Sequence, residues 1–150
     1  MNNFQKYLAE NNIQIEPVTF PAFTKTALQA AQSLNCSVAQ IAKTIAFWAA
    51  DRPLLVIASG TNRISLPKLK ILTGQEIKIM NAKEVQKTLL YVIGGVPPFG
   101  YLSQPLTYLD QDLSIFDQVY AAAGTPNSVF PIAPSTLIEL SQAHPADVKE

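Results

Sequence analysis

The sequence predicts an α+β fold in which a mixed, barrel-like β-sheet is flanked by helices. Helix-capping signals alternate along the chain with short apolar runs of strand length, and two of these runs are separated by a single turn. With 150 residues, of which 48% are hydrophobic and 15% charged, the chain can bury one core. Its sequence contains no internal repeat and no Gly/Ser linker, so residues 1–150 are expected to form a single domain.

Capping residues mark the helices expected near the N-terminus. Asn3 can cap a first helix, and Thr26 followed by Gln29 has the capping-box spacing for a second one. Ser37 can open a short helical turn. Residues 17–21, which begin and end with proline, are expected to be extended.

A hairpin and a further helix are predicted next. Residues 44–50 and 54–59 have the composition of two strands, and residues 51–53 are the expected turn between them. Pro67 and Gly74 are typical of the start and the end of a helix, because proline fits the first helical turn and glycine adopts the left-handed cap.

The second half of the chain continues the alternation. Residues 76–80 are a predicted strand, and Asn81 with Glu84 opens a helix that extends to about Tyr91 and ends before the glycine pair at 94–95. The remaining predicted elements are strands at 106–109, 118–123 and 129–133 and a last helix at 135–142.

Composition and charge exclude several classes of protein. The most apolar stretch, residues 41–59, is interrupted by charges and proline, so we expect no membrane-spanning helix. The N-terminus lacks the pattern of a secretory signal, and a single cysteine, Cys36, cannot form an internal disulfide or a cysteine-rich metal site. We therefore expect a cytoplasmic protein. The zero net charge argues against a general nucleic-acid coat protein, and no DNA partner is expected.

The charge is nevertheless distributed unevenly. Between residues 60 and 90 there are six basic residues and two acidic ones, whereas residues 101–150 are acidic. The basic middle could contact a phosphate backbone locally; the alternative is that these side chains form ordinary solvated faces. The six basic residues are Arg63, Lys68, Lys70, Lys78, Lys83 and Lys87.

Lys43 is the most unusual residue in its setting. In a strand that begins at or near it, alternation places Lys43 on the same face as Ile45, Phe47 and Ala49, and that face is apolar. A lysine is rarely buried without a partner, because desolvation disfavours its charge, so Lys43 is a candidate site residue. The alternative is that Lys43 lies at the mouth of the strand and extends its ammonium into water.

Two glycine-containing segments are further candidates. In residues 94–100, GGVPPFG, the glycines allow a ligand to approach the backbone and the prolines stiffen the turn, so the segment could form a rigid binding lip. Phe99 could stack on a ligand or anchor the core. In residues 124–128, GTPNS, free N–H groups and hydroxyls could hold an ester oxyanion; the alternative is a plain hairpin turn.

The familiar catalytic sets are missing from the sequence. The only histidine, His144, lies near a C-terminus that we expect to be frayed, which argues against a Ser-His-Asp or Cys-His mechanism. Cys36 is more simply a buried residue at a helix end than a nucleophile. Asp110 and Asp112 are expected in a solvated polar turn. No phosphate-binding loop or zinc-ligand spacing is present.

The order of six segments resembles the YbaK/ProX family, which also occurs as the insertion domain of bacterial prolyl-tRNA synthetases. The resemblance covers about residues 26–140. It rests on TALQAA, QIAKTIAF, VIASGTNRISLPKL, GGVPPFG, AAAGTPNS and APSTLIEL.

The resemblance implies a mixed α/β fold around a pocket and an activity that hydrolyses the ester between a mischarged amino acid and the tRNA 3′ adenosine. It also implies that no metal or organic cofactor is needed. The family's lysine falls on Lys43, which would position the substrate, while main-chain amides near the glycines polarise the ester and water or a substrate group attacks. The expected partners are the tRNA acceptor end and an aminoacyl-tRNA synthetase.

The resemblance also implies a set of substrate-binding residues around Lys43. In several alanine-clearing relatives a histidine follows the glycine that matches Gly124, whereas this chain has no histidine there, so Asn127 or Ser128 could replace its hydrogen bond. Alanine, cysteine, serine and proline are the candidate amino acids. The alternatives are a pocket that binds aminoacyl-adenosine without catalysis and a pocket for an unrelated small molecule. The expected binding residues are Phe20, Thr26, Thr44, Gly94, Gly95, Val96, Pro97, Pro98, Phe99, Gly100, Gly124, Thr125, Asn127 and Ser128.

Overall fold

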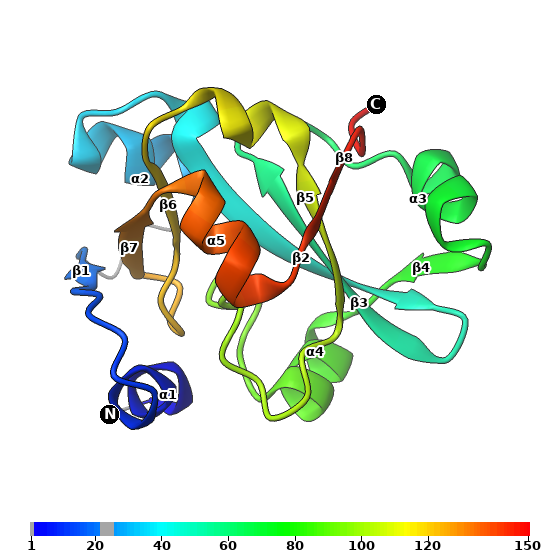
Figure 1. Ribbon diagram of the computed structural model, residues 1–150, viewed down its shortest axis with the longest axis horizontal. Coiled ribbons are helices and arrows are strands. Elements are labelled where there is room, and N and C mark those ends of the chain that lie inside the picture. The colour runs from blue at the N-terminus through cyan, green and yellow to red at the C-terminus, as the bar shows by residue number, and fades with distance from the viewer. Residues whose placement is uncertain (1, 22–25) are drawn as a thin grey trace.

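The computed structural model describes residues 2–21 and 26–150. Within them it contains five α-helices, eight strands and two short 3-10 helices (Figure 1). The elements, in chain order, are α1 (Asn3–Glu10), β1 (Val18–Thr19), α2 (Ala27–Leu34), η1 (Val38–Gln40), β2 (Ile41–Ala49), β3 (Arg52–Ser59), α3 (Leu66–Thr73), β4 (Ile77–Ile79), α4 (Ala82–Leu89), β5 (Leu106–Asp110), η2 (Gln111–Ile115), β6 (Val119–Ala122), β7 (Ser128–Ile132), α5 (Pro134–Ser141) and β8 (His144–Ala146).

The strands form one mixed sheet, which confirms the predicted fold class. Its order is β1-β7-β6-β2-β3-β5-β8, and β4 pairs separately with β2. β2 and β3 are antiparallel, as are β6 and β7, whereas β6 is parallel to β2 and β5 is parallel to β3. The long strand β2 therefore occupies the centre of the sheet and contacts three other strands.

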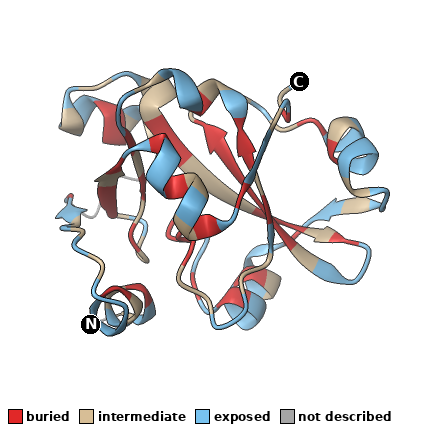
Figure 2. Ribbon diagram, in the orientation of Figure 1, coloured by how far each residue is buried: buried red, intermediate tan, exposed pale blue. Residues whose placement is uncertain are grey.

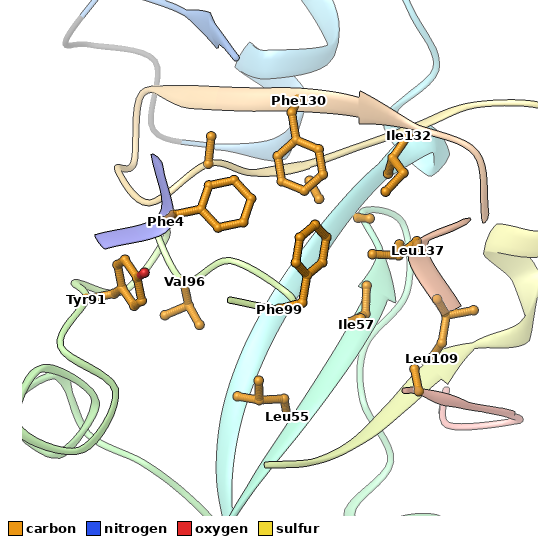
Figure 3. Packing of buried hydrophobic residues seen from close by; sticks show 14 of the residues in the cluster. Phe4, Leu55, Ile57, Tyr91, Val96, Phe99, Leu109, Phe130, Ile132 and Leu137 are labelled. Carbon is orange, nitrogen blue, oxygen red and sulfur yellow. The ribbon is translucent and has the colours of Figure 1, made fainter. Parts of the chain in front are cut away.

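One face of the sheet carries the largest core. Ala42 and Ala46 of β2 lie on this face, which α1, α4 and α5 cover. Three aromatic rings meet in it: the ring centroid of Phe99 lies 5.4 Å from that of Phe4 and 5.7 Å from that of Phe130 (Figure 3). Burying three large rings together stabilises this side of the sheet and joins α1 to it.

The opposite face is covered by two separate helices. Phe47 and Ala49 of β2 pack with Leu69 of α3, and Ile41, at the other end of β2, packs with Ala31 of α2. In Figure 1 α2 and α3 lie at opposite ends of the molecule. Figure 2 shows buried residues along the central strands, while the helices expose their outer sides. The stretch of β2 between these two helices is left less covered.

The predicted capping residues are largely confirmed. Thr26 and Asn81 each accept a hydrogen bond from the N3 amide of their helix, at 3.1 Å and 2.8 Å, and complete the predicted capping boxes. The first helix is capped by Asn2 and not by Asn3, because the Asn2 side chain accepts the N–H of Gln5 at 2.9 Å. Gly74 ends α3 in the left-handed conformation, as predicted, with φ 69°.

The predicted hairpin is confirmed, with longer strands. The pairing extends from Ala42 opposite Ser59 to Ala49 opposite Arg52, so the turn is residues 50–51 and not 51–53. The helix expected to reach Tyr91 ends two residues earlier, at Leu89, because Leu90 adopts the left-handed conformation with φ 67°. No described helix is long and apolar enough to cross a membrane.

Two expectations for the C-terminal third are wrong. The segment around His144 is not frayed, because β8 pairs in parallel with β5 and Val148 is fully buried. Asp110 is not solvated, because it is only 1% exposed and its carboxylate accepts the N–H of Ser59 at 3.1 Å and the amide of Asn62 at 2.7 Å. Pairing between segments far apart in sequence produces both results.

Candidate functional site

A cavity of about 300 Å³ lies where one edge of β2 is open. β6 pairs with this edge only at residues 41–42, and β4 pairs with it only at residues 47–49. No described strand pairs with the edge between these two ladders. The cavity fills this gap in the sheet.

Because the cavity surrounds an open strand edge, residues of both faces of β2 line it. Lys43 and Ile45 come from one face, and Thr44 and Ala46 come from the other. The remaining walls are mostly apolar and come from the start of β2, from α2, β4, α4, β6 and β7, and from the loops between elements. They are Phe20, Thr26, Ala27, Ala30, Ile41, Ala42, Ile79, Met80, Val85, Ile93, Gly94, Val96, Tyr120, Ala122, Pro126, Ser128 and Val129.

Lys43 lies inside β2, as the third of its nine residues, and not at the mouth of a strand. It is directly opposite Ala58 of β3 and shares its face with Phe47 and Ala49, as predicted. Its side chain is half-buried. Burial lowers the pKa of Lys43 below the usual lysine value, the charge of Arg63 lowers it further, and the charge of Asp110 opposes both effects. A cation held in partial desolvation beside a cavity is suited to bind an anionic or carbonyl oxygen.

Thr44 of β2 and Ser128 of β7 both line the cavity. The Oγ1 of Thr44 is buried and has no hydrogen-bond partner among the described residues. The Oγ of Ser128 lies 2.6 Å from the Oγ1 of Thr125. An unpaired buried hydroxyl is uncommon, because leaving such a group without a partner costs about 1–3 kcal/mol.

Only part of the predicted lip at residues 94–100 reaches the cavity. Gly94 and Val96 line it. Pro97 and Pro98 are buried, and their carbonyl groups accept hydrogen bonds from Tyr101 and Gln104. The structure places these prolines, Gly95, Phe99 and Gly100 outside the cavity lining; Phe99, with no exposed surface, anchors the core.

Gly95 nonetheless positions the lip. A β-carbon on Gly95 would lie 2.8 Å from the carbonyl carbon of Thr125, so only glycine permits this approach of the two loops. The contact joins the segment containing Gly94 and Val96 to the loop at residues 124–128. Gly95 therefore shapes the cavity without lining it.

The loop at residues 124–128 is internally bonded and contributes Ser128 to the cavity. Ser128 donates its N–H to the carbonyl of Thr125 at 3.3 Å, so this N–H is not free. The side-chain amide of Asn127 donates to the main-chain carbonyl of Phe20 at 3.1 Å. The main-chain carbonyl of Asn127 accepts the N–H of Phe20 at 2.6 Å. Gly124, Thr125 and Asn127 do not line the cavity. Asn127 instead holds Phe20, which does.

Several lining residues were not predicted from the sequence. Ala27 and Ala30 lie one turn apart on α2, and the capping box at Thr26 could have identified this face. Ile79 and Met80 reach the cavity through the pairing of β4 with β2, which no local signal indicates.

A polar network lies beyond Lys43 on the same side of the sheet. Asp110 and Asp112 both accept hydrogen bonds from Asn62, at 2.7 Å and 2.9 Å, and Lys149 pairs with Asp112 at 2.7 Å. Across residues 2–21 and 26–150, no group of three or more His, Cys, Asp or Glu side chains is placed to hold a metal ion. The network connects the end of β3 to β5 and the C-terminal segment.

Comparisons with known proteins indicate the family of this chain. A family model described as "Aminoacyl-tRNA editing domain" matches residues 22–140. "Uncharacterized protein YwhH" of Bacillus subtilis (strain 168) is 31% identical over 140 residues, which cover 93% of this chain and 87% of that protein. "Putative Cys-tRNA(Pro)/Cys-tRNA(Cys) deacylase EbsC" of Enterococcus faecalis (strain ATCC 700802 / V583) is 24% identical over 125 residues, which cover 82% of this chain and 76% of that protein.

A solved structure is also very similar. "Crystal structure of a putative trans-editing enzyme for prolyl tRNA synthetase" superposes with a TM-score of 0.94 at 36% identity, covering 99% of this chain and 95% of that one. The similarity extends over the whole sheet and the helices that surround the cavity. Because the family model also matches most of the chain, the protein belongs to the aminoacyl-tRNA editing domain family.

Proposed function

We infer that this chain is a trans-editing aminoacyl-tRNA deacylase. Its substrate is a small amino acid, such as alanine, cysteine or serine, wrongly attached to tRNA(Pro) or a similar tRNA. The observation that carries the proposal is the position of Lys43, a half-buried cation at a small, largely apolar cavity in a chain of the editing family. Such a cavity can accept the end of a charged tRNA and exclude larger side chains.

The reaction adds water across the ester. The water oxygen attacks the carbonyl carbon, the bond from that carbon to the ribose oxygen breaks, and the ribose oxygen takes up a proton. The products are the free amino acid and the tRNA with its 3′-terminal hydroxyl. Lys43 binds and orients the acceptor end through its ammonium, and the proposal assigns no metal or organic cofactor to the step.

The surface next to the cavity supports contact with tRNA. Lys78 lies on β4, and Lys83 and Lys87 lie on α4, and all three are exposed. The same two elements contribute Ile79 and Val85 to the cavity wall. These lysines can neutralise phosphates of the acceptor stem. Since the net charge is zero, we expect the chain alone to bind tRNA weakly and in a salt-sensitive way. We therefore propose that a synthetase in the cytoplasm presents the tRNA.

Deacylation in parallel tests the function. tRNA(Pro) carrying alanine, cysteine, serine or proline is incubated with the wild type, with Lys43→Ala and with Lys70→Ala. Lys70 is a matched control because it lies on α3, outside the cavity lining, and pairs with Glu76. We expect the wild type and Lys70→Ala to release one of the small amino acids and Lys43→Ala to release none.

Two outcomes would contradict the proposal. An unchanged rate in Lys43→Ala would remove Lys43 from the mechanism. If the wild type released none of the four amino acids but bound an aminoacyl-adenosine analogue, the chain would be a binding module instead of a hydrolase. Thermal unfolding of each variant confirms that the fold is retained.

A further inference from the structure

Main-chain groups of Thr44 face the cavity. The carbonyl of Ala46 accepts the N–H of Met80 at 3.1 Å, so the main-chain groups of Ala46 point away from β3 and toward the open edge of β2. In a strand, main-chain groups two residues apart point to the same edge. The N–H and the carbonyl of Thr44 therefore also point toward the gap that the cavity fills.

Neither neighbouring ladder reaches these two groups. The parallel pairing of β2 with β6 ends at Ala42 opposite Ala121. One more step of that ladder would require the Thr44 N–H to donate to the carbonyl of Ala122, and the pairing stops before it. On the other side, the pairing with β4 begins only at Phe47. Within the described part of the chain, Thr44 is thus an unpaired position between two paired segments.

Such a gap in a sheet matches a ligand with a particular chemistry. Two opposite residues of an antiparallel, hydrogen-bonded pair exchange both bonds: each N–H donates to the other's carbonyl. A ligand that carries a donor nitrogen and a carbonyl on the same carbon atom can replace one residue of the missing strand. Extended peptides bind to open sheet edges in this way.

We propose that the aminoacyl group binds to the open edge of β2 as a single strand residue. Its α-ammonium donates to the carbonyl of Thr44, and its ester carbonyl accepts the N–H of Thr44. This inference rests on the proposed function and adds to it the part of the substrate that the sheet recognises. The N–H of Thr44 then polarises the carbonyl that water attacks.

The pairing also fixes the direction of the substrate side chain. Directly opposite residues of an antiparallel pair place their side chains on the same face. The side chain of an L-amino acid therefore lies on the face of Thr44, where Ala42 and Ala46 flank it along β2. Ala42 and Ala46 make this part of the cavity wall apolar.

The test uses a ligand that cannot be hydrolysed, so that binding is measured independently of catalysis. The probe is 3′-(alanylamino)-3′-deoxyadenosine, in which an amide replaces the ester. Its affinity is measured for the wild type and for a full-length variant in which the α-hydroxy analogue of threonine at position 44 replaces the N–H by an ester oxygen. We expect binding to weaken about 10-fold, the equivalent of one hydrogen bond.

A second ligand tests the other bond. The lactoyl analogue of the probe replaces the α-ammonium by a hydroxyl group, and we expect the wild type to bind it about 10-fold or more weakly, because a charged donor is lost. Thr44→Val keeps both main-chain groups and loses only the hydroxyl, so its loss of affinity should be smaller than that of the ester variant.

Protein stability separates binding from folding. The ester at position 44 removes no ladder donor and only weakens the Lys43 carbonyl, which faces β3, so it should lower the midpoint of thermal unfolding less than the same replacement at Ala42, which removes a ladder N–H. Equal affinity of the wild type and the position 44 ester variant for the probe would overturn the proposal, as would a complete absence of probe binding. Neither result decides whether the chain is a deacylase, which the tRNA assay measures separately.

Discussion

The carboxylate of Asp110 accepts the main-chain N–H of Ser59 at 3.1 Å, and this bond joins the end of β3 to the end of β5. Ser59 follows Ala58, the residue directly opposite Lys43. The same carboxylate also accepts the side-chain amide of Asn62 and the N–H of Asp112. A buried carboxylate with three donors therefore fixes the backbone beside the candidate catalytic lysine.

Asp110→Asn should destabilise the protein by about 2 kcal/mol. The asparagine amide places donors against the donors of Ser59 and Asn62 and removes the charge that strengthens their bonds. Denaturant unfolding measures the change in the free energy of unfolding. Asp117→Asn is the control. Because Asp117 is exposed, this variant should lose less than about 0.5 kcal/mol of unfolding free energy. Similar losses in both variants would contradict a structural role for the Asp110 network.

Gly95→Ala should destabilise the protein by about 1–3 kcal/mol and lower deacylation. The new β-carbon would be 2.8 Å from the carbonyl carbon of Thr125, so the two loops must separate, and the positions of Gly94 and Val96 at the cavity change. Gly74→Ala is the matched control. Gly74 has space around it and lies at the end of α3. Gly74→Ala should destabilise the protein by about 1 kcal/mol, because residue 74 has a left-handed backbone, and should leave the deacylation rate unchanged.

Arg63→Gln should move the alkaline limb of the deacylation rate to higher pH. Lys43 has a lowered pKa, through burial first and the charge of Arg63 second, so its ammonium loses its proton below the pH usual for lysine. Activity that depends on the charged form is present below that pKa and is lost as the pH rises through it. Removing the Arg63 charge raises the pKa of Lys43. The measurement is kcat/KM against pH, corrected for spontaneous ester hydrolysis, and an unmoved limb would contradict the role of the Lys43 charge.

Tyr91→Phe should stabilise the protein by about 1 kcal/mol. The hydroxyl of Tyr91 is buried without a hydrogen-bond partner among the residues that the structure describes, and burial raises its pKa to about 12. Removing this group ends the cost of its desolvation, while the ring keeps its contact with Tyr101. Thermal unfolding measures the effect. Tyr101→Phe is the contrasting variant: its hydroxyl donates to the carbonyl of Pro97 at 2.6 Å, so its loss should lower stability.

The sequence by itself determined the local elements. The capping boxes at Thr26 and Asn81, the β2–β3 hairpin and the helix between Pro67 and Gly74 all depend on residues within a few positions of one another, and the structure confirms them. The position of Lys43 on an apolar face followed from the same short-range alternation. Local conformational preference and hydrophobic periodicity are properties of neighbouring residues, so they can be recognised in the sequence.

Only the tertiary structure decided where the cavity lies. The open edge at Thr44 exists because β6 and β4 pair with different parts of the same edge of β2, although they come from residues 119–122 and 77–79. The burial of Asp110 and the pairing of β8 depend on contacts between equally distant segments. The free energy of these pairings comes from burial and hydrogen bonds between remote residues, and no local pattern in the chain carries that information.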